Sequence, residues 1–424
     1  MLLGFIFFQK ILQVCRIYYR SYQLGVVQLL IFVIYATLLR LYFVSFVVVI
    51  LKISFFCRAK SIIHYICSIK IVHFYFKIHR NRQIGIMFPS QNIEELKKDI
   101  RDNKAMALFL GAGTDFSSVY PEGHEFDGLR GKTLSWKYLL EELTEAACIN
   151  NEEKNTLNNL ANAPLKAAIL KNRLGNSYIP IIRNWLYTRC NRRILTKSYD
   201  KFKQYKDNPT VENLKKVPFG SLFSIADFIL RQTSIRTVIT QNYNNFLSEA
   251  IKILLDNRGM SYSETRRKMI PLDVYAGWKE EPYNENCFFI YHVHGYIPPP
   301  SEMLPSKESN YIVLSDEEFY QLSKDVYSWQ NATQLHFLTH HTCIILGLSL
   351  DDMTTARLLR HAKLENNSER VYWLRGGRDD PDGELLSRLK TEYYESQHLC
   401  IVNDAEGYQD LYHQILEELT ANEK

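Results

Sequence analysis

The sequence predicts an α/β protein with a doubly wound, Rossmann-like parallel sheet that carries a helical insertion. Short apolar runs that end in Gly or polar residues recur along the chain. They do not alternate with polar residues, as expected of parallel strands that are buried on both faces. Helical stretches lie between or after these runs, and this alternation is typical of a doubly wound sheet. A chain of 424 residues, 46% of them apolar, is long enough to bury such a core.

The predicted strands are Ala105–Leu110, Ile235–Thr240, Phe288–Val293, Cys343–Leu348 and Val371–Leu374. The predicted helices are Asn244–Leu255, Asp316–Ser323, Met353–Ala362 and Gln409–Ala421. Ser315 and Glu318 have the spacing of a capping box, which marks the start of one helix. The composition of Arg375–Gly383 predicts a surface turn.

The pattern divides the chain into three segments. Residues 1–86 form an apolar, basic leader, residues 87–375 the sheet domain, and residues 376–424 a C-terminal α/β extension. Within the sheet domain, about residues 135–231, there is no convincing strand signal. Helical periodicity and polar turns there predict a helical insertion, which could act as a lid or a substrate-access module.

The leader has an unusual charge balance. The first 90 residues hold 11 of the 51 Lys and Arg and none of the 46 Asp and Glu, so the remainder is net acidic. Leu24–Leu51 is long and apolar enough to span a bilayer, although Arg40 near its middle would cost on the order of 2.5–3.5 kcal/mol. Positive charge after this stretch would leave the following domain in the cytoplasm. The alternative that we favour is an over-long reading frame, with a cytoplasmic protein that starts at Met87.

The eight cysteines are scattered, and no two of them form a Cys-x-x-Cys pair. A structural zinc ribbon needs two such pairs, so no zinc is expected. Scattered cysteines, several inside apolar runs, also suit a reducing compartment.

The first candidate motif is Gly111-Ala112-Gly113-Thr114-Asp115, which follows a predicted buried strand. Glycine at two of these positions would let the backbone approach a pyrophosphate, and the helix that follows would offer unpaired N–H groups. Ordinary turns also contain Gly-x-Gly. Only the place of the motif after the first strand of an α/β unit favours a dinucleotide site.

The second motif, Thr240-Gln241-Asn242, lies at the carboxyl end of a predicted strand, where open α/β sheets bind ligands. The amide of Asn242 could hold a ribose hydroxyl or orient a water molecule. The alternative is an ordinary strand-to-helix turn with Asn244 as the helix N-cap.

The third motif contains His292 and His294 at another strand end. An imidazole with a reference pKa of about 6.5 suits a base at neutral pH, although a histidine at a strand end is more often structural. Two histidines at this spacing on a strand share a face, but no third metal ligand is evident.

The fourth motif runs from Gly347 through Ser349 to Asp352. Its polar residues could bind ribose or adenine-side hydroxyls, and the alternative is a helix start.

Together and in this order, the motifs resemble the sirtuin family, in particular a bacterial sirtuin-like branch associated with antiphage defence. Gly111–Gly113 resembles the Gly-Ala-Gly loop of the family, and Thr240–Asn242 its Thr-Gln-Asn motif, which ends on a catalytic Asn. His294–Gly295 is similar to the catalytic His-Gly, and Gly347–Asp352 to a Gly-Phe-Ser element followed by Asp. The resemblance spans roughly Met87–Leu374.

The resemblance implies an enzyme that takes NAD as a substrate and cleaves the bond between nicotinamide and ribose without a metal. Asn242 and His294 would be the catalytic residues. The residues implied in binding NAD are Gly111, Ala112, Gly113, Thr114, Asp115, Thr240, Gln241, Gly347, Ser349 and Asp352.

Two positions depart from the family pattern, because Asp115 stands where Ser is usual and Asn244 where Asp is common. Deacylating sirtuins also carry a four-cysteine zinc module, which helps to form the acyl-lysine groove and has no counterpart here. The resemblance therefore favours a regulated NAD hydrolase in antiphage defence over an NAD-dependent protein deacylase. A non-catalytic nucleotide sensor or scaffold is a third interpretation. The expected partners are further copies of the chain or another defence protein.

The segment Arg183–Lys206 interleaves eight Lys and Arg with aromatic residues. Such a pattern can bind nucleic acid. A solvated helix face or a protein contact fits it better, because the chain after the leader is net acidic. Nucleic acid is therefore not an expected partner.

Overall fold

The structure is a computed structural model, and the residues that it describes lie in one compact unit, Met87–Lys424. They are residues 89–116, 125–126, 129–130, 134–147, 150–206, 217–257, 262, 264–275, 286–304, 312–348, 353–364, 370–374, 389, 392–395, 399–402, 416 and 419. The leader with its apolar stretch Leu24–Leu51, the turn Arg375–Gly383 and most of the helix Gln409–Ala421 lie outside these residues. Within them, no helix combines the length and apolar composition needed to cross a membrane.

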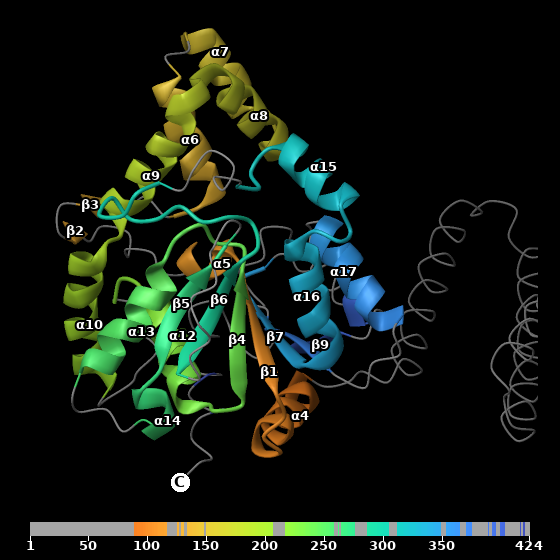
Figure 1. Cartoon of the computed structure of the whole chain (residues 1–424). Coiled ribbons are helices and arrows are strands. Elements are labelled where there is room, and N and C mark those ends of the chain that lie inside the picture. The colour runs from red at the N-terminus through yellow and green to blue at the C-terminus, as the bar shows by residue number, and fades with distance from the viewer. Residues whose placement is uncertain are drawn as a thin grey trace, which may run out of the picture. The chain divides into compact units, whose positions relative to one another are not determined.

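A seven-stranded, all-parallel sheet forms the centre of the described residues, in the order β5-β6-β4-β1-β7-β8-β9 (Figure 1). The strands are β1 (Met106–Leu110), β4 (Ile235–Thr240), β5 (Ile270–Val274), β6 (Cys287–His292), β7 (Thr342–Leu346), β8 (Val371–Leu374) and β9 (Leu399–Val402). The predicted α/β fold with a Rossmann-like parallel sheet is confirmed. The chain fills one side of β1 before it reaches β7, and then fills the other side.

Helices cover both faces of the sheet, so there is one hydrophobic core on each face. Successive residues of a buried strand pack alternately into these two cores. Met106, Leu108 and Leu110 of β1 pack into a large core that includes α12 (Gly220–Arg231) and α13 (Phe246–Asp256). Ala107 and Phe109 pack into a smaller core with α16 (Trp329–His340) and α17 (Met353–Leu364). This alternation is the period of two that a strand imposes on its side chains. Every residue of β1 and β7 is buried, as the apolar runs predict.

The remaining described elements are two short strands and a set of helices. The antiparallel pair is β2 (Glu125–Phe126) and β3 (Leu129–Arg130). The helices are α4 (Pro89–Arg101), α5 (Ala112–Phe116), α6 (Trp136–Ala146), α7 (Asn151–Asn158), α8 (Ala163–Leu174), the 3₁₀ turn η1 (Gly175–Ser177), α9 (Tyr178–Arg189), α10 (Arg192–Lys206), α14 (Glu264–Arg267) and α15 (Asp316–Lys324).

Local sequence signals explain where several of these helices begin. The side chains of Ser135, Asn150 and Asn162 accept hydrogen bonds from backbone N–H groups in the first turns of α6, α7 and α8. The predicted capping box is present at α15, where the Glu318 carboxylate accepts a hydrogen bond from the backbone N–H of Ser315 at 2.6 Å.

The segment from α6 to α12 is helical wherever the structure describes it, and Figure 1 shows α6 to α9 beyond the carboxyl ends of the strands. Its treatment as an insertion, and the boundary at residue 375, stay predictions.

Strands β5 and β9 were not predicted from the sequence. Strand β5 contains Pro271 and lies at an edge of the sheet, where proline is tolerated because one side of the strand needs no ladder hydrogen bonds. Strand β9 (Leu399–Val402) is only four residues long and pairs with β8 at the other edge. Short runs of this kind carry little periodicity.

We predict that Phe223→Ala lowers the free energy of unfolding by about 3–5 kcal/mol, because Phe223 of α12 is fully buried and the change leaves a cavity. Its ring centroid lies 5.5 Å from those of Tyr199 and Phe202 on α10, so the cavity would open between two helices. Urea unfolding measures the loss. Tyr320→Ala, at a side chain on α15 that is 63% exposed, is the control and should change stability by about 0.5 kcal/mol or less. A loss at Phe223 no larger than in the control would contradict this packing.

Candidate functional site

The register of the sheet aligns the ends of four strands. Leu110 of β1 pairs with Thr240 of β4 and with Leu346 of β7, and Thr240 pairs in turn with His292 of β6. The loops that follow these strands therefore meet at one edge of the sheet. In parallel α/β sheets this carboxyl edge, near the strand where the winding changes direction, is where ligands bind.

The loops after β1 and β7 pack backbone against backbone. The N–H of Gly113 donates to the carbonyl of Gly347 at 2.9 Å, and the N–H of Gly111 donates to the carbonyl of Leu346 at 3.0 Å. Gly347 has a φ of +66°, and a Cβ there would lie 2.5 Å from the backbone nitrogen of Thr114. A Cβ on Gly113 would lie 2.8 Å from the Cα of Gly347. Glycine is therefore required at both positions by this contact, before any ligand is considered.

Asn242 is held to the β1 loop through Thr114. The Thr114 hydroxyl donates to the carbonyl of Gly111 at 2.7 Å and accepts from the Asn242 amide nitrogen at 3.2 Å. The backbone N–H of Asn242 donates to the Thr240 hydroxyl at 3.0 Å. Gln241 points elsewhere, and its amide donates to Thr355 of α17 at 2.9 Å. The predicted residues Thr114, Thr240 and Asn242 therefore form one hydrogen-bonded group.

The two positions that depart from the family pattern contact each other. The amide of Asn244 donates to a carboxylate oxygen of Asp115 at 2.6 Å, and its own oxygen accepts from the N–H of Phe246, the first residue of α13. Burial raises the pKa of Asp115 to about 6, although the hydrogen bond from Asn244 and the nearby His292 lower it. A carboxylate and an amide thus lie as a complementary pair.

His292 occupies the other side of this group. One ring nitrogen, Nδ1, lies 2.8 Å from the backbone carbonyl of Asn242, and the other, Nε2, lies 2.8 Å from a carboxylate oxygen of Asp273 on β5. The ring is buried. The sequence motif offers His292 as a base, a structural residue or a metal ligand, and no signal in the sequence points to Asp273.

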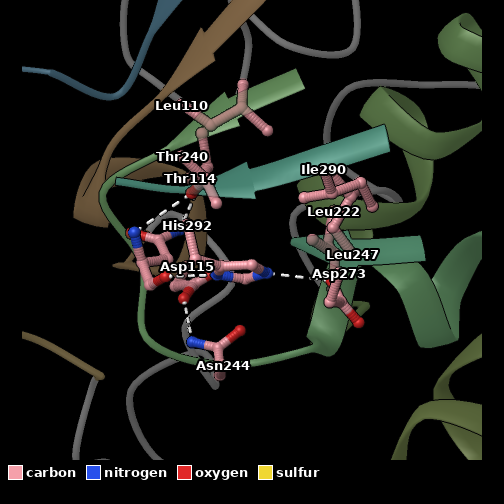
Figure 2. A pocket seen from close by; sticks show the side chains of 11 residues that line it. Leu110, Thr114, Asp115, Leu222, Thr240, Asn244, Leu247, Asp273, Ile290 and His292 are labelled. Atoms are coloured by element: carbon pink, nitrogen blue, oxygen red, sulfur yellow. Dashed lines mark hydrogen bonds and ion pairs between the residues drawn. The ribbon is translucent and has the colours of Figure 1, made fainter. Parts of the chain in front are cut away.

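These groups line a small pocket, shown in Figure 2. Its polar lining is Thr114, Asp115, Thr240, Asn242, Asn244, Asp273 and His292, and its apolar lining is Leu110, Leu222, Leu247, Ile290. Two carboxylates, one imidazole and two amides therefore converge on one cavity whose remaining wall is apolar. This mixture is typical of small-molecule sites.

His294 does not line this pocket. Strand β6 ends at His292, and Gly295 has a φ of +98°, so the chain turns before the two histidines can share a strand face. The ring of His294 meets Phe319 of α15 edge to face, with 5.7 Å between the ring centroids. Gly111, Ala112, Gly113, Gln241 and Gly347 also lie outside the pocket lining, and Ser349 and Asp352 fall outside the described residues. Every one of these site assignments stays a prediction.

A comparison with protein families adds independent evidence. A family model described as SIR2-like domain matches residues 236–399. The match supports a sirtuin-like, NAD-related function for this part of the chain. It covers Asn242, Asp273, His292 and His294, and it does not reach the Gly111–Asp115 loop. No curated protein matches the chain.

Helix α9 is hydrogen-bonded to the loops that follow β4 and β6. The Tyr187 hydroxyl lies 2.7 Å from the carbonyl of Ile297 and 3.3 Å from the side-chain oxygen of Asn245. Arg183 donates to the backbone carbonyls of Pro298, at 2.9 Å, Pro299 and Glu302. The helical segment is thus hydrogen-bonded directly to the residues that follow His294.

Several members of the basic-aromatic run have intramolecular partners. Arg192 pairs with Glu249 and Asp256 of α13 at 2.9 and 3.1 Å, and Arg189 stacks over Trp185 with 5.0 Å to the ring centroid. Together with Arg183, these side chains help to join helices and loops. In the described part of the chain, no group of three or more His, Cys, Asp or Glu side chains could hold a metal ion.

We predict that Asp115 makes stability depend on pH. The unfolded carboxyl titrates near 3.8 and the folded one near 6, so the folded state binds more protons between these values. The contribution of Asp115 to the free energy of unfolding therefore falls, by roughly 3 kcal/mol, as pH rises from about 4 to about 7. Asp115→Asn lacks this titration and should gain stability relative to the wild type over that range. Urea unfolding at several pH values measures the difference, and parallel pH profiles for the two proteins would contradict it.

Proposed function

We propose that the protein is a sirtuin-like NAD glycohydrolase that cleaves the bond between nicotinamide and ribose in NAD. The observation that supports this most strongly is the placement of Asn242. Its side chain is bound to Thr114 and lies at a pocket with Asp115, at the carboxyl edge of a parallel sheet. The SIR2-like match includes Asn242.

The reaction needs little covalent chemistry from the protein. The C–N bond between ribose and nicotinamide breaks, and its electron pair leaves with nicotinamide, which was cationic in NAD and becomes neutral. Water adds to the oxocarbenium-like ribose carbon and loses a proton, which gives ADP-ribose. An enzyme must therefore anchor the phosphates, orient the ribose, and place a base near the attacking oxygen.

Each task has a candidate among the described residues. The loop of Gly111, Ala112 and Gly113 would lie against the pyrophosphate, and the N–H groups of Gly111 and Gly113 themselves donate to the carbonyls of Leu346 and Gly347. Asn242 would orient the water or the ribose hydroxyls. Asp115, whose pKa is about 6, is mostly ionised at neutral pH, so its charge would stabilise the positive ribose centre.

In this proposal His294 takes the proton, either from water or through a ribose hydroxyl. Ser349 and Asp352 would contact the ribose or adenine-side hydroxyls, and Thr240 and Gln241 would support the Asn242 loop.

Uncontrolled loss of NAD is harmful to a cell, so we further propose a regulated enzyme that depletes NAD in antiphage defence. It would act in the cytoplasm as an oligomer or with another defence protein.

Two alternatives remain distinct in their chemistry. An NAD-dependent deacylase would use the same Asn242 and His294 but needs an acyl-lysine substrate. A non-catalytic nucleotide sensor would bind NAD without turnover, an interpretation that rests on the Asp115 and Asn244 departures.

One assay separates all three functions. Purified protein is incubated with NAD, with and without an acetylated peptide, and free nicotinamide is measured by chromatography. Release without peptide supports the glycohydrolase. Release only with peptide identifies a deacylase, and binding of NAD without release under either condition identifies a sensor.

We predict that Asn242→Ala and His294→Ala each abolish NAD cleavage and leave the protein folded. Loss of a general base typically lowers a rate by about 10²–10⁴-fold. Circular dichroism checks the fold, and His336→Ala, an exposed histidine on α16, serves as the control with unchanged turnover. Wild-type turnover by either site variant would remove that residue from the catalytic assignment.

A further inference from the structure

His292 connects three strands through two hydrogen bonds. It lies at the end of β6, faces Asp273 on β5 through Nε2, and faces the backbone carbonyl of Asn242 after β4 through Nδ1. The second carboxylate oxygen of Asp273 lies 2.7 Å from the hydroxyl of Ser248 on α13. The chain of contacts runs from a helix through an edge strand to the backbone of the residue proposed to orient the reacting groups.

The hydrogen-bond geometry fixes part of the protonation state. A carbonyl oxygen can only accept, so Nδ1 of His292 must carry a hydrogen. On the other side, Nε2 faces a carboxylate, and a hydrogen bond forms there only if His292 and Asp273 hold a second proton between them. The two contacts together place a hydrogen on Nδ1 and one proton between Nε2 and Asp273.

The surroundings of the His292 ring are acidic and aromatic. Asp115 and Asp273 line the same pocket as the ring. The Tyr296 ring lies 4.8 Å from it between centroids, and Tyr275 stacks behind Tyr296 at 4.7 Å. These aromatic contacts help to hold the imidazole in place.

Three hydrogen bonds hold Asn242. Its side-chain nitrogen is bound to Thr114, its backbone N–H to the Thr240 hydroxyl, and its backbone carbonyl to His292. Without the contact to His292, the peptide unit after Asn242 is less constrained, and so is the position of the residue that carries the amide. A displacement of about 1 Å at a reacting group can cost about 10²-fold in rate.

We propose that His292, bridged to Asp273, is a positioning residue that holds the backbone of Asn242 so that its amide faces the ribose of NAD. The catalytic part of this inference rests on the proposed NAD cleavage. The structural part, in which the Nδ1 contact of His292 fixes Asn242, is independent of turnover and has its own test.

The first test uses nuclear magnetic resonance without substrate. In protein labelled with ¹⁵N-histidine, Nδ1 of His292 should show the shift of a protonated ring nitrogen, with the signal assigned by its loss in His292→Asn. Asp273→Asn should change the Nε2 shift, because the carboxylate that faces this nitrogen is removed. The side-chain amide signal of Asn242 should shift in both variants.

The matched control is Asp227→Asn. Asp227 on α12 also pairs with a cation, Arg231, and its side chain is 14% exposed, against 13% for Asp273. It should leave both the His292 and the Asn242 signals unchanged. A His292 ring without a hydrogen on Nδ1 in the wild type, or an Asn242 signal that does not respond to Asp273→Asn, overturns the structural part.

The second test is kinetic. We expect His292→Gln and Asp273→Asn to lower kcat for NAD cleavage by about 10–10²-fold and to leave KM within about twofold, because a misplaced Asn242 affects the transition state more than binding. His292→Asn keeps an amide donor near the position of Nδ1 and should recover part of the loss seen in His292→Gln. Asp227→Asn should keep wild-type kcat.

The outcomes separate the two levels of inference. If the wild type releases no nicotinamide, the proposed function fails, and the resonance experiment still decides whether His292 fixes Asn242. If the wild type cleaves NAD but the His292 and Asp273 variants retain kcat, the catalytic role of this pair is wrong. Equal losses in His292→Asn and His292→Gln with lowered thermal stability would show that the pair only joins β5 to β6, which also overturns it.

Discussion

The loops that follow β1 and β7 lie in direct backbone contact, and the rest of the site is built around that contact. Gly113 and Gly347 approach so closely that a Cβ on either would overlap the other loop. This approach places Thr114 where its hydroxyl can meet the amide of Asn242. The contact lies at the centre of the sheet, where the winding of the chain changes direction. The cavity beside it therefore has strands on both sides.

The charges of the pocket have to be considered as a group. Asp115, Asp273 and His292 surround one small cavity, and the state of each depends on the others. Carboxylates at this pocket suit the proposed stabilisation of a cationic ribose centre. The residues at positions 115 and 244 are a carboxylate and an amide. The carboxylate stands on the β1 loop, and the amide that faces it stands on the β4 loop. One carboxylate is thus retained, and two buried carboxylates in direct contact are avoided.

The central strands β1, β7 and β8 were predictable because they are largely continuous apolar runs, and burial on both faces leaves little other explanation for such runs. The edge strand β5 was not, because Ile-Pro-Leu-Asp-Val is short and contains a proline, which weakens the strand signal. Asp273 could therefore not be identified as a site residue, because its contact with His292 depends on the register of β5 against β6. His292 carried a signal, because it ends a strand beside a recognisable motif. Which of two neighbouring histidines enters the pocket depends on where the strand ends, and no pattern in the sequence marks that residue.

The two histidines differ in what holds them. His292 belongs to the sheet and is fixed by β4 and β5, so its position changes only if the strands move. His294 lies in a turn whose continuation, from Ile297 to Glu302, is bound by Tyr187 and Arg183 of α9. A second contact, between Lys171 of α8 and Glu318 of α15, holds the helix against which the His294 ring packs. A displacement of the helical segment would therefore act directly on the turn that carries His294, whereas the two hydrogen bonds of His292 lie within the sheet and the loop after β4.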